Sequence, residues 1–248
     1  MILQVDNLVK SFDGFIAVAG VSFQIEKGEL CSMIGPNGAG KTTLFNMITG
    51  HLPLDKGRVM FNGMDISNLP AHKICRLGLG RSFQRINIFS RLTAFENIQA
   101  AVLTHRGKSL NFFTSVQTLF QEETEEILVS VGLQDHRDAV SGSLAYGFLK
   151  QLELGIALAS DPKMLLLDEP TAGMSRQETK ATIELIGKIV REKGLTLLFT
   201  EHDMSVVFSI SERIMVLHQG QLIASGPPDE VRTNQDVQKI YIGESRCS

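Results

Sequence analysis

The sequence predicts an α/β fold in which a core of parallel strands carries a β-rich N-terminal subdomain and a helical insertion. Three observations predict it. A glycine-rich motif near residue 40 follows an apolar run, apolar runs alternate with helical patterns after residue 160, and the patterns between these parts are helical. We therefore expect one domain, residues 1–248, with its core at 1–89 and 161–248 and a helical subdomain at 90–160.

The first part of the chain accounts for the β-rich subdomain. Leu3–Leu8 and Val21–Ile25 alternate apolar and polar residues, as half-buried strands do. Arg58–Phe61 precedes Asn62-Gly63, a pair that is typical of tight turns. A helix is then expected to begin near Pro70, because proline is favoured in the first helical turn.

The glycine-rich motif is Gly35-Pro36-Asn37-Gly38-Ala39-Gly40-Lys41-Thr42-Thr43, which fits the G-x-x-x-x-G-K-[ST] pattern of a P-loop. Its backbone N–H groups and the dipole of the following helix favour phosphate oxygens. Lys41 can reach the terminal phosphates, and the Thr42 hydroxyl can bind Mg²⁺. The alternative is a glycine-rich turn that binds nothing. The buried-strand pattern Leu30–Ile34 and the helical pattern Thr43–Thr49 on either side favour the P-loop.

Helical patterns fill the insertion. Thr93–Leu103 begins with a threonine followed three residues later by Glu96, as in a capping box. A second apolar stripe runs from Val116 to Val131 and carries four glutamates, which we expect on a solvated face. A third helix is predicted at Leu149–Ala159.

The last part alternates regularly between strand and helix. The predicted elements are a strand at Met164–Leu167, a helix at Gln177–Glu192, a strand at Thr196–Thr200, a helix at Met204–Ile210 and a strand at Ile214–Leu217. This alternation predicts a parallel sheet covered by helices.

Composition excludes several classes of protein. The net charge of −3 leaves no electrostatic footprint for nucleic acid. No uninterrupted apolar run reaches the roughly 18 residues of a membrane span, and the first residues lack a signal-peptide core. The three cysteines, Cys31, Cys75 and Cys247, are widely spaced and odd in number, which indicates reduced thiols in a cytosolic protein.

Two carboxylates end the strand at Met164–Leu167. Because the carboxyl ends of parallel strands form the ligand crevice, Asp168 and Glu169 are expected beside the P-loop. Asp168 would hold Mg²⁺, commonly through water, and Glu169 would polarise an attacking water molecule. The alternative is an exposed acidic pair without a function.

Two further polar residues are candidates for the same site. His202 follows the strand Thr196–Thr200 and could contact a γ-phosphate, although a lone histidine is usually structural. Gln84 could reach Mg²⁺ and the attacking water, and otherwise would be a surface amide.

The ordered set of motifs resembles the nucleotide-binding subunit of an ABC transporter over nearly the whole chain. The set comprises Phe12, the P-loop at 35–43, Gln84, a signature at 144–148, the strand end at 164–169, and His202. The resemblance implies a P-loop NTPase core that binds ATP with Mg²⁺, an aromatic stack of Phe12 on adenine, and ATP hydrolysis. An aromatic residue near a strand is otherwise usually part of the core.

Within this family, the details are similar to importers of branched-chain amino acids. The similarity lies in Leu69–Leu103, Thr200–Met204 and the ending Tyr241-Ile242-Gly243. Urea-type importers and the ATPase of lipopolysaccharide export share parts of it. It implies membrane permease partners, a second ATPase subunit in a homo- or heterodimer, and a place on the cytoplasmic face of the cell membrane. We expect docking near Gln84, with Ile86, Ile88 and Phe89 exposed.

The signature departs from the family pattern, which is LSGGQ or LSYGQ. Here it is Leu144-Ala145-Tyr146-Gly147-Phe148, so Ala145 replaces a serine and Phe148 a glutamine. Gly147 still permits close backbone approach. In the family, each signature completes the nucleotide site on the partner's P-loop, so Ala145 and Gly147 would serve that other nucleotide.

Several interpretations of this departure stay open. The chain could donate a weakened signature to a different cassette, be an ordinary variant, or be a regulatory cassette that hydrolyses ATP poorly. Ser175, where the family usually has Asp or Asn, puts the coupling across the dimer in question too. A soluble ABC protein of the ribosome or DNA is disfavoured, because the chain has one cassette and no basic face.

Overall fold

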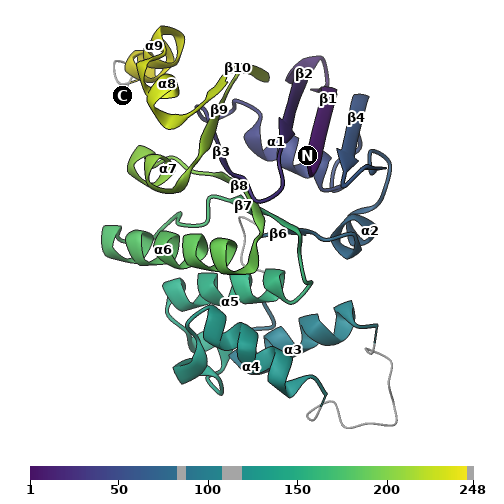
Figure 1. Ribbon diagram of the computed structural model, residues 1–248, viewed down its shortest axis with the longest axis vertical. Helices are drawn as coiled ribbons and strands as arrows, with labels where there is room; N and C mark the ends of the chain where they lie inside the picture. The colour runs from purple at the N-terminus through teal and green to yellow at the C-terminus, as the bar shows by residue number, and fades with distance from the viewer. Residues whose placement is uncertain (83–87, 108–118, 245–248) are drawn as a thin grey trace.

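The computed structural model describes residues 1–82, 88–107 and 119–244. Its strands form two sheets, and the helices α3, α4 and α5 gather at the opposite end of the molecule from the N-terminal strands (Figure 1). This arrangement is the predicted α/β fold with a β-rich N-terminal part and a helical insertion.

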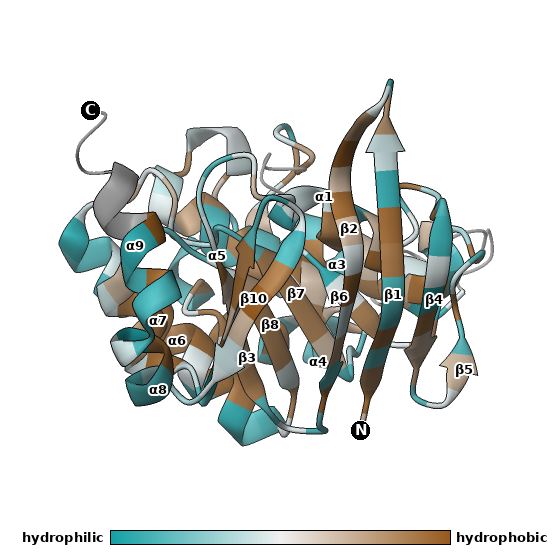
Figure 2. Cartoon of the chain, turned by 90° about the horizontal axis from the view of Figure 1, so that it is seen from above, coloured by the Kyte–Doolittle hydropathy of each residue, from teal (hydrophilic) through white to brown (hydrophobic). Residues whose placement is uncertain are grey.

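The first sheet is antiparallel and has the strand order β2-β1-β4-β5. Its strands are β1 (Leu3–Phe12), β2 (Phe15–Ile25), β4 (Lys56–Phe61) and β5 (Met64–Asp65). The hydrophilic and hydrophobic bands that alternate along β1 in Figure 2 show why one face is buried. β2 begins six residues earlier than predicted, because a turn at Asp13 and Gly14, both with positive φ, pairs it with β1 from its first residue.

The second sheet has the order β10-β9-β3-β8-β7-β6 and is parallel except for β10. Its strands are β3 (Leu30–Ile34), β6 (Leu79–Arg81), β7 (Met164–Asp168), β8 (Thr196–Thr200), β9 (Arg213–His218) and β10 (Gln221–Gly226). Every residue of β3, β7 and β8 is buried, as expected for strands covered on both faces. The P-loop strand β3 therefore lies in the interior of the sheet.

Alternate residues of this sheet feed two hydrophobic clusters. On one face, Leu165 and Leu167 of β7 pack into a cluster with helices α3 to α7. On the other face, Met164 and Leu166 pack into a cluster with α1 (Lys41–Ile48) and the first sheet. The helix after the P-loop is thus held between the two sheets, with fully buried side chains that include Phe45.

The helical insertion contains α3 (Ala94–His105), α4 (Gln121–Ser130) and α5 (Tyr146–Leu158). The capping box predicted for α3 is confirmed by reciprocal hydrogen bonds between Thr93, which precedes the helix, and Glu96 in its first turn. The prediction that the second helix includes Phe120 is wrong, because this residue adopts a left-handed φ of 57° and precedes the helix. The predicted start of α5 is also three residues late.

The remaining helices are α2 (Ala71–Arg76), α6 (Arg176–Lys193), α7 (Met204–Ile210), α8 (Pro228–Thr233) and α9 (Gln235–Glu244). The bounds predicted for α7 are confirmed, and those predicted for α6 differ by one residue at each end. Within the three described ranges, no helix combines the length and apolar character needed to cross a membrane.

Candidate nucleotide-binding site

The P-loop passes so close to neighbouring backbone that two of its positions require glycine. A Cβ atom on Gly40 would lie 2.3 Å from the carbonyl oxygen of Ala17, and one on Gly35 would lie 2.0 Å from that of Leu217. Gly40 also has a left-handed φ of 103° where α1 begins. Strands β2 and β9 therefore help to shape the loop.

The turn between β9 and β10 supports the loop from outside. The backbone N–H of Gly220 donates to the carbonyl of Ala39 at 3.0 Å, and its carbonyl accepts from the N–H of Ala19 at 2.8 Å. One residue of the last hairpin thus joins the P-loop to the first sheet.

Helix α1 presents a positive end to the loop. Its first turn has no acidic residue, and no side chain caps it in the described part of the chain. The first N–H groups of such a helix lack intrahelical partners, and together with the helix dipole they favour an anion.

Lys41 lies inside the loop. Its ammonium donates to the carbonyls of Gly35 at 2.6 Å and Pro36 at 3.0 Å, and the residue is only 7% exposed. These carbonyls compensate for burying the charge, which would otherwise carry a large desolvation penalty. They also hold the ammonium at the loop, where phosphate would lie.

A groove of about 360 Å³ opens over the P-loop. It is lined by Phe12, Phe15, Ala17, residues 37–43 and Glu169. Phe12 is 44% exposed at the tip of the β1–β2 hairpin, so it is not a core residue. Phe15 also lines the groove although the sequence patterns did not predict it, and the Asp13-Gly14 turn, which pairs it with Phe12, is the signal that points to it.

Asp168, at the end of β7, is almost fully buried. One carboxylate oxygen accepts a hydrogen bond from the Thr200 hydroxyl at 2.7 Å, and the other lies 3.7 Å from Nη2 of Arg81. That second oxygen has no hydrogen-bond donor among the described residues. A buried oxygen of this kind suits a hard cation such as Mg²⁺.

Thr42 and Gln84 are the other two predicted metal ligands. Thr42 is exposed and lines the groove. Gln84 lies outside the described residues. Within the described ranges, no three His, Cys, Asp or Glu side chains gather into a metal cluster, and Asp168 is not among the residues that line the groove.

Glu169 and His202 form a close pair. Nε2 of His202 lies 2.7 Å from Oε1 of Glu169. Glu169 has a left-handed φ of 51°, a conformation that costs about 1–3 kcal/mol in residues other than glycine. Its backbone N–H donates to both the carbonyl and the hydroxyl of Thr200, each at 3.1 Å, and these bonds hold the strained residue.

The signature begins helix α5. Ala145 is its N-cap residue and makes no side-chain capping bond. A Cβ on Gly147 would meet only Oε1 of Glu178, at 3.5 Å, so this position is open. Phe148 is half-buried, and its ring centroid lies 4.0 Å from that of His136. Of the described residues, none from 144–148 lines the P-loop groove.

Ser175 has a local role. It caps α6 in a reciprocal capping box with Glu178, so the residue that departs from the family pattern still starts its helix as Asp or Asn would.

At the predicted docking region, Phe89 is 65% exposed, but Ile88 is half-buried against the larger cluster, so its predicted exposure is wrong. Ile86 lies outside the described residues.

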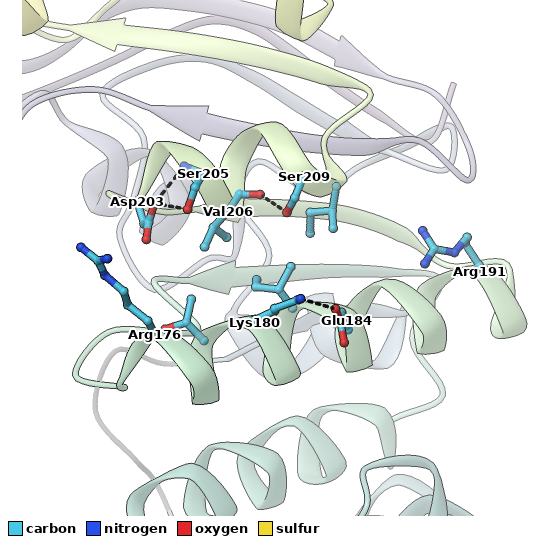
Figure 3. A pocket seen from close by; sticks show the side chains of 11 residues that line it. Arg176, Lys180, Glu184, Arg191, Asp203, Ser205, Val206 and Ser209 are labelled. Carbon is cyan, nitrogen blue, oxygen red and sulfur yellow. Dashed lines mark hydrogen bonds and ion pairs between the residues drawn. The ribbon is translucent and has the colours of Figure 1, made fainter.

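A wider hollow of about 820 Å³ lies between α6 and α7 (Figure 3). Its rim carries Arg176, Lys180 and Arg191, and Lys180 pairs with Glu184 at 3.9 Å. None of the predicted nucleotide or metal residues lines it. Size alone therefore does not select the candidate site, and the smaller groove is the candidate because the residues of the P-loop motif line it.

A family model described as ABC transporter matches residues 18–172 of the chain. This chain belongs to the ABC transporter family. A second model, described as branched-chain amino acid ATP-binding cassette transporter, matches residues 221–246 of the cassette. The family predicted from the motifs is thus confirmed, and the cassette is an ABC ATPase.

Curated relatives match the cassette over almost its entire length. It is 40% identical over 253 residues to the high-affinity branched-chain amino acid transport ATP-binding protein BraF of Pseudomonas aeruginosa, and 36% identical to LivG of Salmonella typhimurium. It is 34% identical to the lipopolysaccharide export system ATP-binding protein LptB of Haemophilus influenzae. Each alignment covers 98% of both chains.

Solved structures confirm the fold. The ADP conformation of MJ1267, an ATP-binding cassette of an ABC transporter, superposes with a TM-score of 0.83 at 33% identity and covers 98% of both chains. The cbiO1 subunit from Clostridium perfringens, part of the transporter complex cbiONQ, gives a TM-score of 0.82 at 26% identity and covers 99% of this cassette and 96% of that chain.

Proposed function

We propose that the cassette hydrolyses ATP to power a membrane importer of branched-chain amino acids. The match of residues 221–246 to the branched-chain family model supports this substrate class, as does the similarity to BraF and LivG. Its partners would be permease subunits and a second cassette, on the inner face of the cell membrane. The lower similarity to LptB keeps a lipopolysaccharide system as the alternative.

The observation that carries the catalytic proposal is the Glu169–His202 pair beside the P-loop groove. Glu169 would orient a water molecule in line with the γ-phosphate and accept its proton. His202 would hold the Glu169 carboxylate and stabilise charge on the phosphate oxygens. Gln84 would help to orient the water.

Nucleotide binding would use the rest of the groove. Adenine would stack on Phe12, with Phe15 beside it on the same hairpin. The P-loop N–H groups would bind the phosphates, and the ammonium of Lys41 would exchange its carbonyl partners for phosphate oxygens. Thr42, Gln84 and Asp168 would hold Mg²⁺, which when bound neutralises charge on the β- and γ-phosphates.

The altered signature favours a dimer with unequal sites. The N-terminal backbone of α5 at Gly147 would face the partner's nucleotide and still offer N–H groups and a helix dipole. Ala145 removes the hydroxyl, and losing one hydrogen bond to a charged acceptor costs about 1.5–3 kcal/mol. We propose that the cassette pairs with a different cassette, whose P-loop site receives this weaker signature.

The decisive experiment reconstitutes the cassette with permease subunits, a second cassette and a solute-binding protein of the same organism. Vesicles loaded with ATP and Mg²⁺ should take up radiolabelled leucine, and the Glu169→Gln variant should not. ATP hydrolysis without leucine uptake, together with ATP-dependent release of lipopolysaccharide, would replace the importer with the alternative.

A further inference from the structure

The carboxylate of Glu201 is a buried charged group that the proposed chemistry does not use. Glu201 lies between the end of β8 and His202, and it is only 4% exposed. Burial raises the pKa of this carboxyl, and the hydrogen bonds from Thr171 and His202 oppose the rise. A buried carboxylate is tolerated only where donors compensate it, so its surroundings indicate what it holds.

Three donors from two loops converge on this carboxylate. Its Oε1 atom accepts hydrogen bonds from the backbone N–H of Thr171 at 2.9 Å and from the Thr171 hydroxyl at 2.7 Å. Its Oε2 atom accepts from the backbone N–H of His202 at 3.3 Å. Glu201 therefore joins the loop that follows β7 to the loop that follows β8.

These are the two loops that carry the catalytic pair. Glu169 lies two residues before Thr171, and the N–H of Ala172 donates back to the carbonyl of Glu169 at 3.1 Å. His202 directly follows Glu201. The 2.7 Å contact between the Glu169 and His202 side chains thus spans the same gap as the buried bonds of Glu201.

The same loop leads to the start of α6. The N–H of Met174 donates to the carbonyl of Thr171 at 3.1 Å, and the next residue, Ser175, caps the helix. Movement of Thr171 would therefore displace both Glu169 and the residues that precede α6.

We propose that Glu201 is a positioning residue, whose buried carboxylate fixes the loops of Glu169 and His202 at the separation that hydrolysis requires. The inference rests on the proposed catalytic role of Glu169 and His202. Glu201 touches neither water nor nucleotide in this role, and it acts through the backbone of His202 and the loop at Thr171.

The principal test is the Glu201→Gln variant of the full chain. The amide oxygen of glutamine can still accept from Thr171, but its NH₂ group would face the N–H of His202, so two donors would meet. We expect kcat for ATP hydrolysis to fall roughly 10- to 100-fold, because small displacements of catalytic groups have effects of this size. KM for ATP should change less than about threefold, since the P-loop contacts are untouched. The control is Glu192→Gln, an exposed glutamate on α6.

A double-mutant cycle separates positioning from general destabilisation. The His202→Ala change removes the side-chain contact whose geometry Glu201 is proposed to set, so the Glu201→Gln change should lower kcat less in a His202→Ala background than in the unaltered chain. An equal loss in both backgrounds would overturn the proposal. So would a kcat of Glu201→Gln within twofold of the unaltered chain.

Hydrogen exchange supplies a readout that needs no nucleotide. Exchange of the backbone amides at Glu169, 171–174 and 201–203 should accelerate in Glu201→Gln, whereas the P-loop amides at Gly35 and 37–43 should keep their rates. The milder Thr171→Val variant, which loses only the hydroxyl donor, should accelerate the same amides if Glu201→Gln fails to fold. Unchanged exchange in both loops would refute the inference. Full turnover in Glu169→Gln would instead refute the catalytic proposal itself.

Discussion

The imidazole of His202 contacts the carboxylate of Glu169 at 2.7 Å, across the carboxyl ends of the neighbouring strands β8 and β7. The glutamate side chain is 16% exposed and the histidine 48%, so the pair opens toward solvent at one side. A water molecule and a phosphate could therefore approach a carboxylate whose orientation is already set.

Replacing Glu169 with glutamine should stop turnover while leaving ATP bound. The amide keeps the shape of the side chain but cannot accept a proton, so we expect kcat to fall by about 100-fold or more. Turnover and retained radiolabelled ATP would be measured on the assembled complex, with Glu192→Gln as the control. Full turnover in Glu169→Gln would remove this residue from the catalytic role.

The Gly40→Ala change should distort the P-loop and weaken ATP binding. A Cβ at this position would lie 2.3 Å from the Ala17 carbonyl, so the loop must shift, and we expect ATP affinity to fall about tenfold or more. Gly28→Ala is the matched control, because Gly28 has a similar left-handed φ of 81° but open space around it. Binding of a fluorescent ATP analogue would be compared in the two variants. Equal losses of ATP affinity in the two variants would contradict the prediction, because they would show that the close approach to Ala17 is not the cause.

The Arg81→Met change should destabilise the fold strongly. Arg81 and Asp168 are buried together, and Nη1 of Arg81 also donates to the Asn46 side chain at 2.7 Å. Removing one partner of a buried pair leaves the other charge uncompensated, which lowers the free energy of unfolding by about 3–5 kcal/mol. Arg58→Met is the control, because its pair with Asp65 is exposed and should contribute about 0–1 kcal/mol. Urea unfolding measures both, and similar losses would contradict the prediction.

Cys31 should resist alkylation in the folded chain. Burial raises the pKa of its thiol to about 12, and the nearby Glu29 charge adds to the rise. At pH 8 iodoacetamide should modify the exposed Cys75 and leave Cys31 unmodified until urea is added, as mass spectrometry would show. Rapid modification of Cys31 in the folded chain would contradict this.

Since the pKa of the Cys31 thiol in the folded chain lies above the unfolded value of about 8.5, the free energy of unfolding should also fall as the pH rises above about 8.5.

The Ala145→Ser change should have two separable effects. A serine at this N-cap position of α5 can accept from a backbone N–H, which should stabilise the fold by about 0.5–2 kcal/mol. In the assembled complex it should also raise ATPase activity at the site on the partner's P-loop. Unchanged ATPase activity, with the stability gain present, would show that the alanine does not limit that site.

Local signals were predictable from the sequence. The apolar runs of β3, β7 and β8, and the capping box at Thr93 and Glu96, depend on residues close together in the chain. They could be predicted because each pattern contains its own physical cause.

Other features depend on pairings between distant residues. The strand β6 has only three residues, and its place beside β7 is set by a partner more than 80 positions away, so no local pattern marks it. The role of Glu201 is hidden for the same reason, because its donors include Thr171, 30 positions earlier. The half-buried place of Ile88 likewise follows from the cluster that covers it.

The bonds of Gly220 bear on how this molecule is made. The glycine motif is synthesised early, yet Ala39 receives the N–H of a residue in the last hairpin, and Gly35 packs against Leu217 on the strand before it. A nascent chain in which residue 220 has not yet been synthesised contains every residue of the motif but lacks the hydrogen bond from Gly220 to Ala39. Nucleotide should therefore bind only late in synthesis, and a truncated chain that ends before β9 should not bind ATP.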